Sequence, residues 1–241
     1  MTKFIAHRGA SYLAPENTLS AFKLAKKNEV DFVEFDVRLS KDGIPVVIHD
    51  PVIKEAIEAG RVAEISKLTL EEIKQWDVGT SFGSAYAGER IPTLREVFDL
   101  GWQNTGLMLE IKECGSEDLT LVSAIFDILL DLQHLPKLII GSFSPEIVLE
   151  SQKLIKANQL DISLIGIVEE MKYIERFIEM RVGYMAVWEK LVTSQLVHDL
   201  HSSGIEVWVF TVDEISRAQS LIALEVDGII SNKLDAGPPM L

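Results

Sequence analysis

The feature that most constrains the fold is the regular alternation of short apolar runs with amphipathic helical patterns. The apolar runs are bounded by polar or turn residues, which indicates buried strands. Eight of them occur, at Lys3–Ala6, Phe32–Val37, Leu107–Ile111, Leu138–Gly141, Leu164–Val168, Tyr184–Val187, Glu206–Thr211 and Gly228–Ile230. Helical patterns separate them, at Leu19–Lys27, Thr93–Leu100, Leu119–Leu132, Pro145–Ala157, Met171–Met180, Ser194–Ser202 and Glu214–Leu221. Repetition of strand and helix is typical of a parallel α/β fold.

Eight such units in 241 residues predict a TIM (β/α)8 barrel. An open, doubly wound sheet is the alternative, because periodicity does not show whether a sheet closes. That alternative is weakened because no Gly-rich dinucleotide fingerprint follows the first strand. In a barrel, functional residues should collect at the carboxyl ends of the strands.

The stretch Val33–Asp50 adds a hairpin to the second predicted strand. Apolar residues alternate with Glu34 and Asp36, so the two carboxylates share one face of the strand, about 7 Å apart. A second apolar run, Pro45–His49, follows too soon for a parallel crossover and should return antiparallel. The second strand is therefore predicted to carry a short antiparallel partner.

Asp42-Gly43 supplies the positive φ angles that a tight two-residue turn needs. Counting outward from this turn brings His49 opposite Asp36, so the hairpin would deliver an imidazole to the carboxylate pair. Two neighbouring carboxylates repel each other unless a cation lies between them or one is protonated. On these residues alone, an ordinary surface hairpin with solvated acids is an equally good interpretation.

Residues 51–90 break the alternation. Two modest helical patterns, Val52–Ala59 and Leu70–Trp76, precede a run rich in Gly and Ser, Gly79–Gly88. A segment of about forty residues is too short for an independent core. We therefore expect one domain, residues 1–241, with residues 51–90 inserted after the hairpin and covering the C-terminal mouth of the barrel.

Composition narrows the classes of partner. The net charge is −14 and the mean hydropathy is +0.18. This argues against nucleic acid or an anionic membrane, which both need a positive surface, but not against a small phosphate ligand. The single cysteine, Cys114, cannot form an internal disulfide, which suits a reducing compartment. The first apolar run, Phe4–Ala6, is too short for a signal sequence. We expect a soluble, cytoplasmic protein without stable membrane association; the sequence does not indicate its oligomeric state.

Polar side chains stand at the carboxyl ends of the predicted strands. The first three strands end in His7 and Arg8, in Glu34 and Asp36, and in Glu110 and Lys112. Later strands end in Ser142-Phe143, Glu169, Trp188-Glu189, Phe210–Asp213 and Ser231-Asn232. With His49 from the hairpin, three carboxylates, two histidines, an arginine and a lysine are thus predicted to meet at one mouth.

This set of side chains suits metal-assisted phosphate chemistry. Carboxylate oxygens favour Mg²⁺ or Ca²⁺, whereas zinc more often recruits His or Cys. Arg8 and Lys112 are cationic donors for a phosphate, the arginine through a bidentate fork. His7 and His49 titrate near neutrality and can carry protons to and from oxygens. Either histidine taken alone is better explained as a hydrogen-bonded residue at a strand end.

The sequence resembles the glycerophosphodiester phosphodiesterase family, in its bacterial cytoplasmic type. The motifs that carry the resemblance follow the family's order: His7-Arg8-Gly9, Pro15-Glu16-Asn17-Thr18, Glu34-Phe35-Asp36-Val37, Lys41-Asp42-Gly43, His49-Asp50, Ile91-Pro92-Thr93-Leu94, Leu109-Glu110-Ile111-Lys112, Ser142-Phe143 and Val226-Asp227-Gly228-Ile229-Ile230. Together they are specific and cover most of the chain.

The resemblance implies a TIM barrel and a role for each matched residue. It implies a divalent cation held by Glu34, Asp36 and Glu110, phosphate contacts from Arg8 and Lys112, an acid–base pair of His7 and His49, and a substrate-side position for Glu16, Asn17 and Phe210. It also suggests that the glycerol hydroxyl next to the phosphate attacks first, giving a cyclic intermediate that water then opens. Which histidine is the base stays open.

Three positions depart from the family pattern. An Arg-Thr-Thr segment that follows the His-Asp pair in many members is replaced by residues 51–56, Pro-Val-Ile-Lys-Glu-Ala. The usual Trp-Thr-Val-Asn is Phe210–Asp213 here, and a terminal Thr-Asp is Ser231-Asn232. None of these changes removes a proposed ligand or histidine, so they bear on the alcohol part of the substrate.

The function predicted from the sequence is metal-dependent hydrolysis of glycerophosphodiesters, such as deacylated phospholipids, to sn-glycerol 3-phosphate and an alcohol. One alternative is phospholipase-type cleavage of a lysolipid, which needs an apolar entrance. Another is a catalytically silent phosphate-binding barrel. The intact histidine pair argues against the silent barrel. The lack of an amphipathic membrane helix or basic patch argues against a lipid surface.

Overall fold

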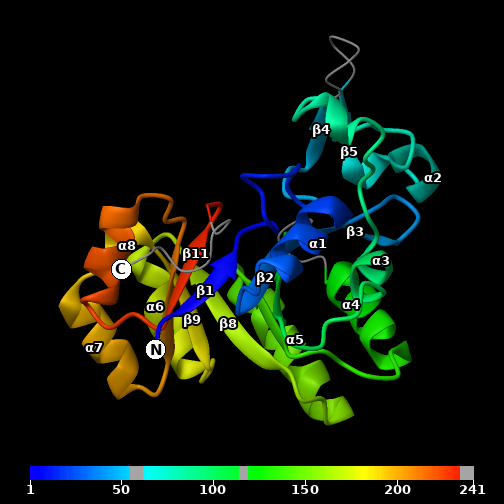
Figure 1. Cartoon of the computed structure of the whole chain (residues 1–241). Coiled ribbons are helices and arrows are strands. Elements are labelled where there is room, and N and C mark those ends of the chain that lie inside the picture. Colours follow the sequence, from blue (N-terminus) through cyan, green and yellow to red (C-terminus); the bar gives the residue numbers. More distant parts are fainter. Residues whose placement is uncertain (55–61, 114–118, 234–241) are drawn as a thin grey trace.

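The computed structural model describes residues 1–54, 62–113 and 119–233. Within these residues, eight parallel strands form a closed barrel with helices around it (Figure 1). The strands are β1 (Lys3–Ala6), β2 (Phe32–Leu39), β6 (Gly106–Ile111), β7 (Leu138–Ser142), β8 (Ser163–Val168), β9 (Tyr184–Trp188), β10 (Glu206–Phe210) and β11 (Gly228–Ser231). Closure is made by β1, which pairs with β11 on one side and with β2 on the other. The predicted TIM barrel is confirmed, and the open sheet is excluded.

Helices occupy the predicted places between the strands. Their bounds are α1 (Leu19–Lys27), α3 (Leu94–Phe98), α4 (Thr120–Asp131), α5 (Pro145–Asn158), α6 (Ile174–Glu179), α7 (Ser194–Ser202) and α8 (Ile215–Ile222), with 3-10 turns η3 (Met171–Tyr173) and η4 (Glu189–Leu191). Their starts follow from local chemistry: Thr18 caps α1, and Thr93 with Glu96 forms a capping box on α3. These caps satisfy backbone N–H groups that would otherwise lack partners.

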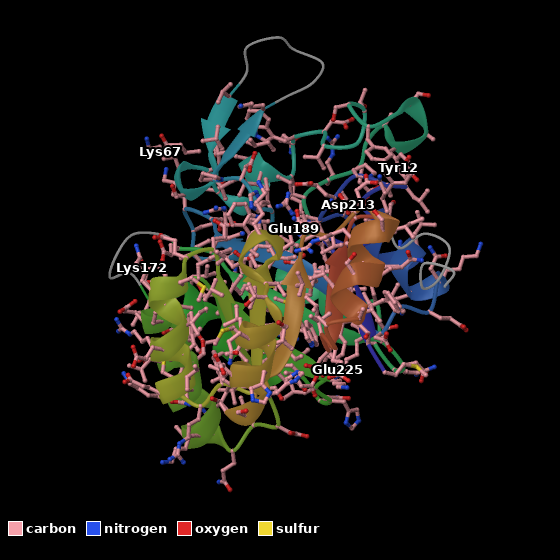
Figure 2. The ribbon with its side chains drawn as sticks, turned by 90° about the vertical axis from the view of Figure 1, so that its left-hand side faces the viewer. Tyr12, Lys67, Lys172, Glu189, Asp213 and Glu225 are labelled. Atoms are coloured by element: carbon pink, nitrogen blue, oxygen red, sulfur yellow. The ribbon has the colours of Figure 1, made fainter. Side chains whose placement is uncertain are left out.

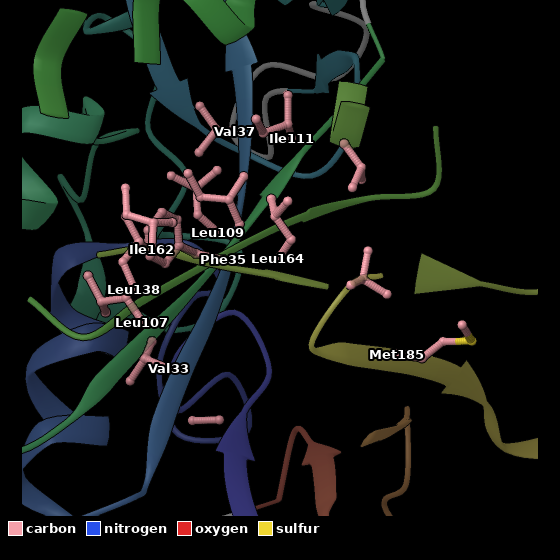
Figure 3. Packing of buried hydrophobic residues seen from close by; sticks show 14 of the residues in the cluster. Val33, Phe35, Val37, Leu107, Leu109, Ile111, Leu138, Ile162, Leu164 and Met185 are labelled. Atoms are coloured by element: carbon pink, nitrogen blue, oxygen red, sulfur yellow. The ribbon is translucent and has the colours of Figure 1, made fainter. Parts of the chain in front are cut away.

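Side-chain alternation along the strands separates two apolar layers. Odd-numbered residues of β2 face the helices, as Phe35 shows by its edge contact with Phe22 of α1, at 5.7 Å between ring centroids. Figure 3 shows side chains of this outer layer on β2 and β6, among them Phe35 and Leu109. Even-numbered residues face the barrel interior, where Phe32 meets Trp208 with ring centroids 5.0 Å apart. The interior is therefore filled with apolar side chains below its mouth.

The hairpin is present, but its predicted register is wrong by one residue. Strand β3 (Pro45–Val47) runs antiparallel to β2, and Val37 pairs with Val47. The amide N–H of Ile48, not that of His49, donates to the carbonyl of Asp36, at 3.0 Å. The physical reason is the turn, in which Gly43 has a φ of 79° and Asp42 has no positive φ. A three-residue loop with glycine in the left-handed position replaces the two-residue turn.

The described part of residues 51–90 has a small apolar cluster of its own. Its elements are β4 (Val52–Lys54), β5 (Val62–Glu64), η1 (Ile65–Lys67), α2 (Leu70–Ile73) and η2 (Ser84–Tyr86). The helix predicted at Val52–Ala59 is wrong where it can be compared, because β-branched Val52 and Ile53 pair with β5 as a strand. Residues 55–59 of the predicted helix, like Cys114, lie outside the described residues. The hairpin of β4 and β5 lies beyond β3 (Figure 1).

No described helix has both the length and the apolar character needed to cross a lipid bilayer.

Candidate active site

The polar residues at the mouth follow from the same alternation that fills the interior. On β2, Phe32 lies in the apolar interior, and the inward positions that follow it are Glu34 and Asp36. On β6, Met108 lies in the interior and Glu110 is the next inward position. Register brings them together, because Asp36 stands beside Glu110 in the parallel pair of β2 and β6. On both strands, the inward-facing side chains thus change from apolar to acidic toward the carboxyl end of the barrel.

Glu34, Asp36 and Glu110 form a buried acidic cluster that can hold a metal ion. Each offers one carboxylate oxygen, and these oxygens all lie within 4.8 Å of one another. None of the three residues is more than 7% exposed. Hard carboxylate oxygens in this number are ligands that Mg²⁺ and Ca²⁺ accept, and the absence of His or Cys from the cluster does not favour zinc.

Two cationic side chains flank the acidic cluster. Lys112 lies 2.9 Å from Asp36 and also forms an ion pair with Glu110. The guanidinium Nε of Arg8 lies 3.3 Å from Asp36, and the backbone N–H of Arg8 donates to Glu34 at 2.9 Å. Asp36 is thus the carboxylate that both cations share.

The charges change the pKa values of the three acids in different directions. Burial, with Asp36 close by, raises the pKa of Glu110 to about 7. Burial followed by the neighbouring carboxylates raises the pKa of Glu34 well above its usual value. Burial alone would raise the pKa of Asp36, but Lys112 and Arg8 outweigh it and the pKa is lowered. Full ionisation of the three acids is therefore unfavourable without a further cation, and a bound cation would stabilise their ionised forms.

A loop after β1 holds Arg8 and Asp36 in place. Glu16 accepts two hydrogen bonds from one guanidinium nitrogen of Arg8, at 2.9 and 3.1 Å. The side-chain amide of Asn17 donates to Asp36 at 2.8 Å and accepts from its backbone N–H at 3.2 Å. Arg8 and Asn17 both have a φ of 57°, a strained conformation for residues with a Cβ. The backbone N–H of Asn17 donates a 3.0 Å hydrogen bond to the carbonyl of Arg8, which helps to hold this conformation.

His7 lies at the edge of the acidic cluster. Its Nε2 is 3.9 Å from a carboxylate oxygen of Glu34, and its side chain is 16% exposed. Burial, followed by the positive charge of Arg8, lowers the pKa of His7 to about 4. A neutral imidazole therefore faces the cluster at pH 7. A small cavity beside it is lined by Glu34, Glu110 and Phe210.

His49 lines a different and larger cavity, of about 410 Å³. Its Nδ1 lies 2.8 Å from Asp50, and its side chain is 34% exposed. The wall of this cavity also includes Glu16, Asn17 and Phe82. Asn17 therefore borders the cavity of His49 while its amide contacts Asp36. The two predicted histidines therefore line separate cavities.

Phe210 lies where the sequence placed it, at the end of β10. Its ring meets that of Phe143 edge to face, with centroids 6.0 Å apart. Lys112 lies over the Phe143 ring, 5.9 Å from its centroid. Phe210 is thus part of an aromatic wall beside the charged cluster.

Two residues that contact this site were not among those predicted for it. The side chain of Asn232, after β11, lies 2.7 Å from Nδ1 of His7. Asp213, after β10, accepts hydrogen bonds from the side chain and backbone of Asn232. Figure 2 shows Asp213 at the same end of the molecule as Lys67, away from Glu225. Asn232 and Asp213 both stand at the ends of predicted strands, but the contacts that bring them into the site are not visible in local sequence patterns.

A comparison with known sequences decides the family. Residues 7–236 match the glycerophosphoryl diester phosphodiesterase family over almost the whole chain.

The chain belongs to this family.

Several members of the glycerophosphoryl diester phosphodiesterase family match this chain over nearly its whole length. The glycerophosphodiester phosphodiesterase of Caldanaerobacter subterraneus subsp. tengcongensis is 35% identical, over 96% of this chain and 94% of the relative. A phosphodiesterase of Oleispira antarctica, solved in complex with the product sn-glycerol-3-phosphate, is 32% identical with a TM-score of 0.86, covering 98% of this chain and 94% of that one. A glycerophosphodiester phosphodiesterase structure from Thermotoga maritima is 27% identical, with a TM-score of 0.74 and coverage of 98% and 96%. The resemblance stated from the motifs is confirmed.

Proposed function

We propose that this chain hydrolyses glycerophosphodiesters to sn-glycerol 3-phosphate and an alcohol, with the help of a divalent cation. The observation that carries the proposal is the buried acidic cluster flanked by Arg8 and Lys112, in a chain of this family. The product bound to the Oleispira antarctica relative supports the choice of substrate. A small soluble diester is the expected partner, and the cytoplasmic location stays a prediction.

The residues of the acidic cluster fit a divalent cation, Mg²⁺ or Ca²⁺. Glu34, Asp36 and Glu110 would hold it, and it would supply Lewis-acid polarisation of a phosphoryl oxygen. When all three carboxylates are ionised they outnumber the two cations that flank them, and one of these cations, Arg8, is also paired with Glu16. A divalent cation would offset this excess of negative charge and so favour the binding of a phosphodiester anion.

Arg8 and Lys112 would bind the phosphate, since their cationic groups stand at the edge of the cluster. Glu16 would orient Arg8 through its two hydrogen bonds, and Asn17 would orient Asp36. Phe210 would bound the substrate on the other side, beside His7. These residues hold charged groups in place before the substrate arrives, which lowers the cost of reorganisation during the reaction.

His7 and His49 would transfer the protons. Cleavage needs an attacking oxygen to lose a proton and a leaving alcohol oxygen to gain one. His7 stands beside the acidic cluster, and His49 borders the 410 Å³ cavity with Phe82. This cavity is where we place the alcohol. In this proposal, residues 51–90 are an insertion in a single domain, cover the mouth and shape the alcohol pocket.

The test is a panel of soluble glycerophosphodiesters and lysolipids, assayed for release of sn-glycerol 3-phosphate with and without a chelator. We expect release from the soluble diesters that depends on Mg²⁺ or Ca²⁺. Turnover of lysolipids alone would favour the phospholipase-type alternative. Binding of glycerol 3-phosphate without turnover of any substrate would favour the silent barrel.

A further inference from the structure

The ring nitrogen Nδ1 of His7, which faces away from the acidic cluster, has a hydrogen-bond partner within the fold. Strands β1 and β11 are parallel neighbours, with Ala6 opposite Ser231, so His7 and Asn232 leave their strands side by side. The His7 N–H donates to the Ser231 carbonyl at 3.0 Å, which holds the two ends together. The His7 Nδ1 then lies 2.7 Å from Oδ1 of Asn232.

Asp213 determines which way the Asn232 amide points. One oxygen of Asp213 accepts from the Asn232 backbone N–H at 2.8 Å and from the Ser231 hydroxyl at 3.0 Å. The other lies 2.7 Å from the Asn232 amide nitrogen. Burial would raise the pKa of Asp213, but these hydrogen bonds lower it, so the group is a carboxylate that only accepts. The Asn232 nitrogen must therefore face Asp213, and its oxygen must face His7.

The amide orientation fixes the tautomer of His7. A carbonyl oxygen only accepts, so Nδ1 of His7 must carry the hydrogen. In a neutral imidazole the other nitrogen then has a free electron pair. That nitrogen, Nε2, is the one 3.9 Å from Glu34.

We infer that Asp213 and Asn232 are a positioning pair that makes His7 the general base of the reaction. The inference rests on the proposed catalytic role of His7. The O–H bond of the attacking hydroxyl breaks, its proton goes to Nε2 of His7, and the oxygen electron pair forms the bond to phosphorus. The bond from phosphorus to the leaving oxygen breaks, and that oxygen keeps the electron pair and takes a proton from His49. The Nδ1–H bond to Asn232 persists while the ring is charged.

At positions 213 and 232, the two departures from the family pattern amount to an exchange of Asn and Asp between the two positions. The pattern quoted above has Asn at position 213 and Asp at position 232, and this chain has the reverse. An asparagine at 213 could accept through the oxygen that now takes the Ser231 and Asn232 bonds, and donate through the other atom. An aspartate at 232 would then accept from it and from His7. Exchange of the two residues therefore preserves every hydrogen bond and the net charge.

This gives a direct test with three variants of the full chain. Asn232→Asp places two carboxylates 2.7 Å apart, and Asp213→Asn removes the acceptor that fixes the amide. We expect each to lower kcat about tenfold or more while KM changes less than about threefold, because orientation of the base is needed only in the transition state. The double variant D213N/N232D should recover to within about threefold of the unchanged protein. A merely structural role would not give this recovery in kcat.

A ¹⁵N NMR measurement of the imidazoles reads the tautomer directly. His7 should show a protonated Nδ1 and an unprotonated Nε2, and Asp213→Asn should perturb this pattern. His201 is the internal control, because its Nε2 lies 2.7 Å from Asp227 and it should show the opposite tautomer. Asp227→Asn, the matched substitution at that second pair, should leave kcat and the His7 signals unchanged.

His7→Ala separates this inference from the proposed function. If His7→Ala keeps normal turnover, the proposed role of His7 fails. If His7→Ala loses turnover but both single variants keep normal kcat, the positioning pair is overturned. An Nε2-protonated His7 in the unchanged protein, or a double variant no better than the poorer single, would overturn it as well.

Discussion

The strand-built rim and the described part of residues 51–90 both line the candidate site, and the two regions are held together in different ways. At the rim, Asp36 lies on a strand paired on both sides and is 1% exposed. In the 51–90 segment, Phe82 comes from a run rich in Gly and Ser and is 44% exposed. Hydrogen-bonded strands position the charged groups, whereas the segment contributes exposed side chains on short elements. This contrast suggests that the rim sets the reaction and the segment sets the choice of alcohol.

The apolar cores of the two regions are also separate. The barrel interior packs around Phe32 and Trp208, while the segment packs around Ile73 and Trp76. The segment cluster is joined to the barrel through Val46 of β3. Substitutions in the segment should therefore change substrate preference more than they change the stability of the barrel.

Removal of the divalent cation should have the largest effect. We expect a chelator to abolish turnover and lower the melting temperature, because the stabilisation that a bound cation gives to the folded Glu34, Asp36 and Glu110 cluster is then lost. Added Mg²⁺ or Ca²⁺ should restore both quantities. Calorimetry and a product assay on the same sample measure them. Full turnover in excess EDTA would exclude a metal-dependent mechanism.

The two histidines should give the next largest effect. His7→Ala and His49→Ala should each lower kcat on the order of 10²-fold or more, with metal binding retained. The double variant should be little worse than the poorer single, because the two act as a unit. His201→Ala, at the far pair with Asp227, is the control. Near-normal turnover in either single variant that still binds metal would contradict the paired mechanism.

The pH dependence of kcat/KM tests whether His7 acts as the neutral base. Because burial and Arg8 lower the pKa of His7 to about 4, the ring stays neutral as the pH falls from 7 toward 5. The acidic limb of a bell-shaped profile should therefore lie below the ordinary histidine value of about 6.5. His7→Ala should remove that limb from the residual activity. With the metal at saturation, so that protonation of Glu110 does not compete, an acidic limb centred above 6.5 in the unchanged protein would contradict this assignment.

The sequence was sufficient to predict the rim, because alternation along a strand determines which side chains face inward. Alternation along the strands and the strand-end rule of a barrel predict Glu34, Asp36 and Glu110 at one mouth, and the structure brings their oxygens together. Asn232 and Asp213 stood at strand ends too, but their importance lies in contact with each other and with His7. Such contacts depend on the pairing of β1 with β11, which closes the barrel and is not visible in local patterns.

Short elements were predicted less well, because small differences in turn geometry change them. The Asp42-Gly43 turn was assigned two residues, and one additional residue shifts every pair in the hairpin. At Val52 the helical spacing of apolar residues competed with β-branched side chains, and pairing with β5 decided for a strand. Both errors fall in the hairpin and the segment, where tertiary contacts outweigh local preference.

Phe82→Ala should affect the alcohol side of the substrate alone. Phe82 lines the cavity with His49, so its removal should raise KM for diesters with bulky alcohols by about threefold to tenfold. The value of kcat should change by less than about twofold, because the rim is untouched. Leu130→Ala, an exposed apolar change on α4, is the control and should leave KM unaltered. A fall in kcat with constant KM would place Phe82 in the reaction instead.

Asp77→Asn should give the smallest effect and should be confined to the segment. One carboxylate oxygen of Asp77 accepts from the backbone N–H groups of Gly79 and Thr80, both at 2.9 Å. The other accepts from the Gly88 N–H at 2.7 Å and from the Thr80 hydroxyl at 2.9 Å. An asparagine keeps the first set, but its nitrogen cannot accept from Gly88. We expect a loss of about 1 kcal/mol in the free energy of unfolding, since water screens this accessible group.

The pH dependence of that loss follows from the lowered pKa. The Thr80 N–H, together with that of Gly88, lowers the pKa of Asp77 to about 2. A carboxyl whose pKa is lower in the folded state stabilises the protein above its unfolded value, about 3.9, and this contribution disappears as the pH falls toward 2. Denaturant unfolding at pH 6 should therefore separate Asp77→Asn from the unchanged protein, and the two curves should converge between pH 4 and pH 2. Asp131→Asn, at an exposed ion pair with Arg95, is the control. A difference that stays constant down to pH 2 would show that the asparagine acts by its shape and not by the loss of a charged acceptor.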